Sequence, residues 1–156
     1  MIRLMQQKDN PVIHKIIQRS LEQHHLNLPG TAYFDPQLGA LYDYYQAIPN
    51  AAYWVVEHEG TVVGGIGIAP FDLSKNICEL QKFYIADFAQ GLGYGRALME
   101  TALAFAEKHY QACYLETMHK LQTACILYEK FNFDLLQQPL PGSDHSTMDA
   151  WYIKRF

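Results

Sequence analysis

A glycine-rich turn between a strand and a helix is the feature that most restricts how this chain can fold. Residues 76–97 read NICELQKFYIADFAQGLGYGRA. Their first half has the β-branched and aromatic content of a buried strand, and the residues from Arg96 onward favour a helix. Glycine occupies positions 91, 93 and 95, where the missing Cβ atoms let a ligand approach the backbone closely. The turn is therefore predicted to direct several N–H groups at phosphate oxygens, at the positive end of the following helix.

The spacing of the glycines decides which phosphate ligand fits. A dinucleotide fingerprint, G-x-G-x-x-G, would need glycine where Arg96 stands, and a Walker loop would need a Gly-Lys-Ser/Thr sequence that is absent. The pattern Gln/Arg-x-x-Gly-x-Gly/Ala does fit, with Gln90, Gly93 and Gly95 at its fixed positions. With the preceding strand, the following helix and a later Ala-x-x-x-Tyr-Glu-Lys segment at 124–130, the chain resembles the GNAT superfamily of acyl-CoA-dependent N-acetyltransferases.

Length and composition predict one globular domain. A chain of 156 residues can bury one good core but not two, so residues 1–156 are expected to form a single N-acetyltransferase domain. The chain is 49% apolar and 18% charged, which is typical of a soluble folded protein. No apolar run could span a bilayer and the N-terminus lacks the apolar stretch of a signal peptide, so we expect a cytoplasmic protein without a membrane partner.

Net charge and the spacing of cysteine and histidine argue against a nucleic-acid-binding site and a metal site. The net charge is −4 and no basic cluster occurs, so nucleic acid is not an expected partner. Cys78, Cys113 and Cys125 show no C-x-x-C spacing and are expected to be buried free thiols. His24 and His25 are neighbours that would point in different directions from a helix, so no metal site is predicted.

The N-terminal part predicts a strand followed by two helices. Residues 2–5 are a short strand candidate. Asn10 is expected to cap a helix with Pro11 in its first turn, and isoleucine and leucine recur on one face of it from Ile13 onward. A second helix is expected to start with Asp35 as its cap and to carry leucine and tyrosine on one face.

The remaining pattern predicts a sheet with two inserted helices. Antiparallel strands are expected at 52–57, 61–70 and 76–85, and then a helix to His109, a strand at 112–117, a helix at 121–131, and strands at 133–137 and 149–155. Three glycines inside the second of these strands indicate a bulge or a close approach by backbone or ligand. The expected fold class is α/β (α+β), GNAT-like, with a mostly antiparallel sheet, a central parallel strand pair and helices on both faces.

The resemblance implies which residues bind acetyl-CoA, the expected co-substrate, with no metal involved. The backbone of the turn would hold the pyrophosphate of coenzyme A through Gln90, Gly91, Leu92, Gly93, Tyr94, Gly95 and Arg96. The backbone of Phe83, Tyr84 and Ile85 would pair with the pantetheine arm. One N–H of this strand would then act as an oxyanion donor to the thioester carbonyl.

A general base is needed to remove a proton from the attacking ammonium group. Glu79 looks like the glutamate that histone acetyltransferases of this superfamily use for that role. Glu116, on the neighbouring strand, is the rival candidate. Alternatively Glu79 faces solvent or forms an ion pair with Lys82 or Lys130. Strand alternation predicts Glu79, Gln81 and Phe83 on one face.

A general acid toward the departing thiolate is suggested by the segment 124–133. Its sequence ACILYEKFNF resembles the family's Ala-x-x-x-Tyr-Glu-x-x-Gly-Phe, whose tyrosine, here Tyr128, often donates that proton. The alternative is a core tyrosine on the apolar stripe of its helix. Two departures stand out: Leu121 replaces a frequent asparagine, which would weaken cofactor binding, and Asn132 replaces glycine at a helix end, where asparagine tolerates the left-handed conformation.

The acceptor site is less defined by the sequence. Tyr33 and Phe34 are candidates for its wall, with packing roles as the alternative, and His145 lies in a loop that reaches the acceptor in related enzymes. The resemblance implies an N-acetyltransferase that moves an acetyl group from acetyl-CoA directly to a primary amine of a small molecule or peptide. The alternatives are a catalytically inactive acyl-CoA-binding regulatory module and a dimerising domain without cofactor. Each of these is compatible with a homodimer.

Overall fold

A seven-stranded sheet forms the centre of the computed structural model, which describes residues 1–156. The strands lie in the order β1-β2-β3-β4-β5-β7-β6, and only the β4–β5 pair is parallel. Their bounds are β1 Ile2–Leu4, β2 Ala52–His58, β3 Thr61–Asp72, β4 Ile77–Ile85, β5 Ala112–Thr117, β6 Asp134–Leu136 and β7 Ala150–Arg155. The predicted fold class is confirmed.

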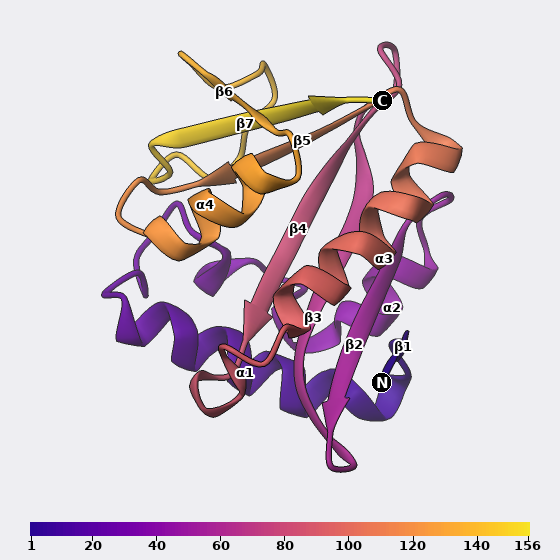
Figure 1. Ribbon diagram of the computed structural model, residues 1–156, viewed down its shortest axis with the longest axis vertical. Helices are drawn as coiled ribbons and strands as arrows, with labels where there is room; N and C mark the ends of the chain where they lie inside the picture. Colours follow the sequence, from indigo (N-terminus) through magenta and orange to yellow (C-terminus); the bar gives the residue numbers. More distant parts are fainter.

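Four α-helices cover the two faces of the sheet: α1 Asn10–Gln23, α2 Leu41–Gln46, α3 Tyr94–His109 and α4 Gln122–Lys130. Figure 1 shows α3 and α4 in front of the sheet, with α1 and α2 behind it. Each face therefore has its own apolar core. Leu98, Met99 and Ala102 of α3 belong to the front core, and Ile13 and Ile17 of α1 belong to the rear one.

The parallel pair β4–β5 is short, and this creates an opening in the sheet. The two strands pair only at Ile77–Ala112, Cys78–Cys113 and Glu79–Tyr114. Beyond Glu79, β4 continues to Ile85 without β5, which stays paired with β7 instead. Figure 1 shows the two strands diverging from their common end. The opening lies next to the strand that precedes the glycine-rich turn.

A β-bulge in β4 changes which side chains share a face. Gly67 pairs with Gln81 and Gly65 with Tyr84, so two residues, Lys82 and Phe83, oppose one residue of β3. Lys82 takes up the extra length with a left-handed backbone at φ 51°. Phe83 consequently packs into the front core, whereas the side chain of Gln81 accepts a hydrogen bond from Tyr45 behind the sheet, at 2.7 Å. The prediction that Glu79, Gln81 and Phe83 share one face is wrong for Phe83, because the bulge interrupts the alternation.

The glycines of β3 lie opposite the bulge, whose extra residue belongs to β4. At Gly67 the approaching groups are aromatic rings of the protein, rather than the backbone or ligand that the sequence suggested. A Cβ atom on Gly67 would lie 2.5 Å from the hydroxyl of Tyr45 and 2.9 Å from the ring of Tyr53. The rear core therefore requires glycine at this position.

Two expectations about the N-terminal helices are wrong. Asn10 is the first residue of α1 rather than its cap, and its side chain accepts a hydrogen bond from the Tyr42 N–H at 3.0 Å. No helix starts at Asp35; short 3₁₀ turns at Ala32–Phe34 and Leu38–Ala40 precede α2. The carboxylate of Asp35 is instead bound by Lys82 and His145, a tertiary contact that outweighs its local preference for capping.

The predictions for the cysteines and for Asn132 are confirmed. The three cysteines are buried free thiols, and Asn132 has the left-handed backbone expected at the end of α4, with φ 66°. None of the helices has the length and apolar character required to cross a bilayer. No three His, Cys, Asp or Glu side chains are grouped so that they could hold a metal ion.

The close approach at Gly67 predicts a large stability cost for a small substitution. Gly67→Ala should lower the free energy of unfolding by about 1–3 kcal/mol, because the buried rings of Tyr45 and Tyr53 must move to admit the methyl group. Gly95→Ala is the matched control, since a Cβ there meets its nearest neighbours at 3.5 Å and alanine favours a helix. Urea unfolding of both variants measures the difference. Equal stability of Gly67→Ala and the wild type would contradict this packing of the two rings.

Candidate active site

One cavity of about 760 Å³ occupies the opening between β4 and β5. Its walls come from α1, β4, the glycine-rich turn, β5, α4 and the loop before β7. The sequence-predicted residues that line it are Glu79, Phe83, Tyr84, Ile85, Gln90, Gly91, Gly93, Tyr94, Gly95, Arg96, Glu116, Tyr128 and His145. The fold therefore gathers both catalytic candidates and almost all of the proposed cofactor-binding backbone around one space.

Three predicted site residues do not line this cavity: Leu92, Tyr33 and Phe34. The Tyr33 hydroxyl donates a hydrogen bond to Glu22 at 2.7 Å, and the Phe34 side chain is largely exposed. Their neighbours Thr31 and Ala32 line the cavity instead. The aromatic pair thus lies beside the cavity rather than in its wall.

The turn after β4 presents its backbone outward. Gly91 and Gly93 have left-handed backbones, with φ 79° and 86°, and glycine adopts this conformation at no steric cost. Ala97 is the first residue whose N–H bonds back into the turn, to the Gly93 carbonyl at 3.2 Å. The N–H groups that precede it have no acceptor within the helix, as at any helix start. Anions bind at such a position.

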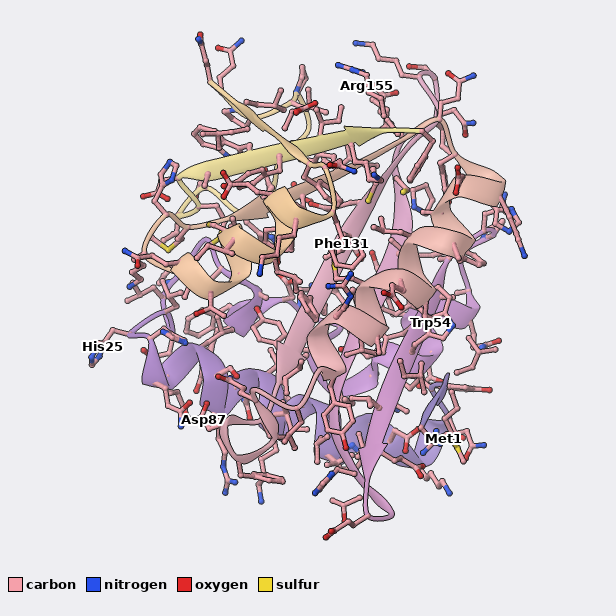
Figure 2. The ribbon with its side chains drawn as sticks, viewed as in Figure 1. Met1, His25, Trp54, Asp87, Phe131 and Arg155 are labelled. Carbon is pink, nitrogen blue, oxygen red and sulfur yellow. The ribbon has the colours of Figure 1, made fainter.

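Gln90 fastens this turn to the end of β4. Its side-chain amide donates a hydrogen bond to the carbonyl of Ile85 at 3.1 Å. Arg96 reaches from the start of α3 over the ring of Phe131, 5.8 Å from its centroid. Figure 2 shows Phe131 at the end of α4 next to α3. The rim of the cavity is therefore tied to both flanking elements.

The backbone of β4 beyond Glu79 has no neighbouring strand on the side of the opening. The Ala86 N–H donates to the carbonyl of Val63 on β3 at 2.8 Å. Because neighbouring residues of a strand direct their peptide groups to opposite sides, the N–H of Ile85 points away from β3. That direction is toward the gap left by β5. An extended ligand in the cavity could pair with this strand edge.

Glu79 lies at the point where β4 and β5 separate. One of its carboxylate oxygens accepts a hydrogen bond from the side-chain amide of Gln81 at 2.8 Å. Burial, reinforced by the negative charge of Glu116, raises the pKa of Glu79 to about 7, although the hydrogen bond from Gln81 opposes this. The ion-pair alternative is wrong, because Lys82 binds Asp35 and neither it nor Lys130 pairs with Glu79. Glu79 can therefore exchange a proton near neutral pH.

Glu116 has fixed partners and little freedom. Its side chain is 2% exposed. One oxygen accepts hydrogen bonds from the Tyr114 hydroxyl, at 2.8 Å, and from Ser143. The other oxygen lies 3.9 Å from Nδ1 of His145. These contacts suit a carboxylate that anchors the loop before β7.

Tyr128 faces the cavity from α4. Its ring packs 6.4 Å from that of Phe83 and 5.9 Å from that of Tyr152, centroid to centroid. The hydroxyl has no hydrogen-bond partner in the protein but is not sealed from the cavity. Burial raises the pKa of this hydroxyl well above its ordinary value, so it keeps its proton at neutral pH. It is a proton donor by default.

Two residues beside the site, Lys82 and Asp35, were not found by sequence reasoning. Lys82 lines the cavity, and its ammonium group lies 2.5 Å from the carboxylate of Asp35. His145, which was predicted, donates a hydrogen bond from Nε2 to the same carboxylate, whose two oxygens both lie 3.2 Å away. That hydrogen bond raises the pKa of His145 despite its burial. No local pattern links positions 35, 82 and 145, so the sequence held no signal for this contact.

Comparison with known proteins gives related chains over most of this sequence. The model of the acetyltransferase (GNAT) family matches residues 20–133. The uncharacterized N-acetyltransferase YjgM of Escherichia coli (strain K12) is 40% identical over 147 residues, which are 92% of this chain and 87% of that protein. The N-acetylaspartate synthetase of Xenopus tropicalis is 30% identical over 116 residues, 71% of this chain and 42% of that protein.

Solved structures share the fold at low sequence identity. An acetyltransferase of the GNAT family from Staphylococcus aureus Mu50 superposes with a TM-score of 0.84 at 19% identity, covering 99% of this chain and 98% of that one. YncA, a putative acetyltransferase from Salmonella typhimurium solved with its cofactor acetyl-CoA, gives 0.78 at 18% identity, covering 99% and 92%.

The family match spans well over half of the chain and includes β4, the glycine-rich turn and Tyr128. The E. coli relative extends the similarity over nearly the whole sequence. This chain therefore belongs to the acetyltransferase (GNAT) family and is an acyltransferase of the N-acetyltransferase class.

Proposed function

We propose that this enzyme transfers an acetyl group from acetyl-CoA directly to a primary amine of a small molecule or peptide. The observation that carries the proposal is the single cavity that joins the glycine-rich turn, the free edge of β4, Glu79 and Tyr128. A base, an acid and two backbone binding elements around one space are what direct acetyl transfer requires. The acetyl-CoA bound to the structural neighbour YncA supports the donor.

The backbone suits the donor in two places. The N–H groups of 91–96 would hold the pyrophosphate, where helix dipole and unpaired donors favour negative charge. The edge of β4 from Phe83 to Ile85 would pair with the amides of the pantetheine arm. An N–H group held there would stabilise the oxyanion that forms at the thioester carbonyl, an effect of roughly 3 kcal/mol.

Glu79 is proposed as the general base. The acceptor enters as an ammonium group, and it must lose a proton before its nitrogen can attack the carbonyl carbon. Glu79, directly or through a water molecule, would take that proton. Its pKa of about 7 suits proton exchange at neutral pH. Glu116 is less suited, because both of its oxygens already face protein partners.

Tyr128 is proposed as the general acid. As the new C–N bond forms and the C–S bond breaks, the sulfur leaves with the bonding electron pair. The neutral hydroxyl of Tyr128 would give its proton to that thiolate. Support comes from its place in the cavity wall and from the absence of a protein partner that would hold the hydroxyl elsewhere. A regulatory module that only binds acyl-CoA would need neither this group nor a buried base.

The donor assignment predicts selective stabilisation by acetyl-CoA. At 100 times its Kd, acetyl-CoA should add about 2.7 kcal/mol to the free energy of unfolding, which raises Tm by roughly 5–10 °C. ATP and NAD at the same concentration should give a smaller shift. Differential scanning fluorimetry measures all three. A larger shift with NAD than with acetyl-CoA would overturn the donor assignment.

Matched glycine variants sharpen this test. Gly93 in the turn and Gly60 between β2 and β3 both have left-handed backbones, with φ 86° and 79°, and a Cβ added at either would meet open space. Substitution of either by valine imposes similar backbone strain. Only Gly93→Val should lose the acetyl-CoA shift, and Gly60→Val should keep it.

The assignment of the base predicts a change in pH dependence. In the wild type, log(kcat/KM) should rise more steeply below a pH of about 7 than above it, because Glu79 must have lost its own proton before it can take one from the ammonium group. Glu79→Gln should lower kcat by about 10² to 10⁴ and remove the steeper part of the profile. An unchanged profile in this variant would assign the base to another residue.

Stability gives an independent reading of the same pKa. The folded-state pKa of Glu79 is raised, so the folded protein binds the proton more tightly than the unfolded chain and loses stability as pH rises from about 4.5 to about 7. Glu79→Gln removes this loss. The variant should therefore gain roughly 2–3 kcal/mol relative to the wild type between pH 4 and pH 8, as measured by urea unfolding.

The assignment of the acid predicts a loss of turnover without a loss of binding. Tyr128→Phe should lower kcat by roughly 10²-fold, whereas the Kd of acetyl-CoA should change by less than about twofold. Tyr152→Phe is the control, because its ring packs against Tyr128 but does not line the cavity. Steady-state assays with thiol detection across an amine panel give kcat, and an equilibrium titration with acetyl-CoA gives its Kd. Normal turnover in Tyr128→Phe would leave this tyrosine with a packing role only.

A further inference from the structure

The carboxylate of Asp35 binds a lysine and a histidine that come from distant parts of the chain. Its Oδ2 lies 2.5 Å from Nζ of Lys82 in β4, and both of its oxygens lie 3.2 Å from Nε2 of His145 in the loop before β7. Lys82 and His145 line the cavity, whereas Asp35 does not. Asp35 therefore contacts the cavity only through these two residues.

Lys82 depends on this contact for two reasons. Its side chain is 5% exposed, and a buried ammonium group without a partner is strongly unfavourable. Its backbone is left-handed, with φ 51°, a conformation that a non-glycine residue keeps only when its surroundings hold it there. The Tyr53 hydroxyl anchors the carbonyl of Lys82 at 2.7 Å, and Asp35 anchors the side chain.

The bulge at Lys82 sets the relation between the proposed base and the donor-binding strand. It leaves Glu79 and Gln81 behind the sheet and turns Phe83 to the front core. A strand without the extra residue would exchange the faces on one side of the bulge. The geometry between Glu79 and the edge of β4 therefore depends on the contact that fixes Lys82.

The hydrogen bond between Asp35 and His145 holds the loop at residues 137–149. His145 meets Asp35, and Thr147 bonds to the α1–α2 connection through its N–H to Gly30, at 3.2 Å, and its hydroxyl to Pro29, at 2.6 Å. Burial opposes ionisation of Asp35, but His145 and Lys82 together lower its pKa. Asp35 thus stays charged, and its contacts connect three segments of the chain beside the cavity.

We propose that Asp35 is a positioning residue for acetyl transfer, which fixes the β4 bulge through Lys82 and the 137–149 loop through His145. The role rests on the proposed function, because it concerns the placement of Glu79 relative to the donor. It requires no contact between Asp35 and the substrate. It predicts that Asp35 affects the chemical step more than the binding of acetyl-CoA, because the turn at 90–96 is anchored separately by Gln90.

Kinetics of Asp35→Asn test this role. The variant should lower kcat at least tenfold, while the Kd of acetyl-CoA changes by less than threefold. Asp35→Glu, which keeps the carboxylate, should retain more activity than Asp35→Asn. Lys82→Met should cause a similar loss, and the double variant Asp35→Asn/Lys82→Met should lose little more than either single variant, because both remove the same contact. Asp144→Asn is the matched control, since Asp144 is an exposed acid of the same loop without an ion pair.

An NMR titration of His145 gives a readout that does not depend on turnover. Asp35 raises the pKa of His145, so Asp35→Asn should lower that pKa and Asp144→Asn should leave it unchanged. An unaltered His145 titration in Asp35→Asn would overturn the proposal, as would a kcat within twofold of the wild type. A loss of acetyl-CoA affinity as large as the loss of kcat would also overturn it, because it would indicate general disruption. Absence of turnover by the wild type with every amine would instead overturn the proposed function, and the positioning role with it.

Discussion

The parallel pairing of β4 and β5 ends at Glu79 and Tyr114, and every element of the site depends on this separation. Had the strands remained paired, the edge of β4 would be saturated with hydrogen bonds and no cavity would pass between the two faces of the sheet. The antiparallel partner β7 keeps β5 in the sheet after it leaves β4. Hydrogen bonds between β4 and β5 are therefore missing only beside the cavity, where a ligand could replace them.

Burial gives the two catalytic candidates opposite tasks. A carboxylate in a desolvated position holds its proton more tightly, so burial moves Glu79 toward a pKa of about 7. A phenol in the same cavity also holds its proton more tightly, so Tyr128 stays neutral. One physical cause therefore brings the pKa of Glu79 near neutrality and keeps Tyr128 protonated, which suits the roles of base and acid proposed for them.

The bulge at Lys82 exchanges the two faces of β4, so that side chains before and after it face in different directions than in a regular strand. Before the bulge, the side chain of Gln81 lies behind the sheet against Tyr45; after it, Phe83 joins the core beneath α3 and α4. Such an irregularity is unfavourable by itself, and it persists here because an ion pair and a tyrosine hydroxyl hold it from two directions. Glycines opposite the bulge accommodate the rings behind the sheet.

Local sequence patterns predict most of the helices and strands. Hydrophobic periodicity and glycine-rich turns act over a few residues, so these patterns sufficed for the strands, the buried helix faces and the turn. The family resemblance, carried by Gln90, Gly93, Gly95 and the segment around Tyr128, suggested where the donor would bind. The same resemblance suggested Glu79, which precedes the turn on one strand.

The tertiary structure alone decided how these parts meet. The expected helix start at Asp35 was wrong because Lys82 and His145, 47 and 110 residues away, bind the carboxylate that would have capped it. The face of Phe83 was wrong because a bulge depends on packing across strands rather than on the sequence of one strand. Contacts between residues so far apart leave no periodic trace, so only the folded chain shows that Asp35, Lys82 and His145 form one cluster beside the site.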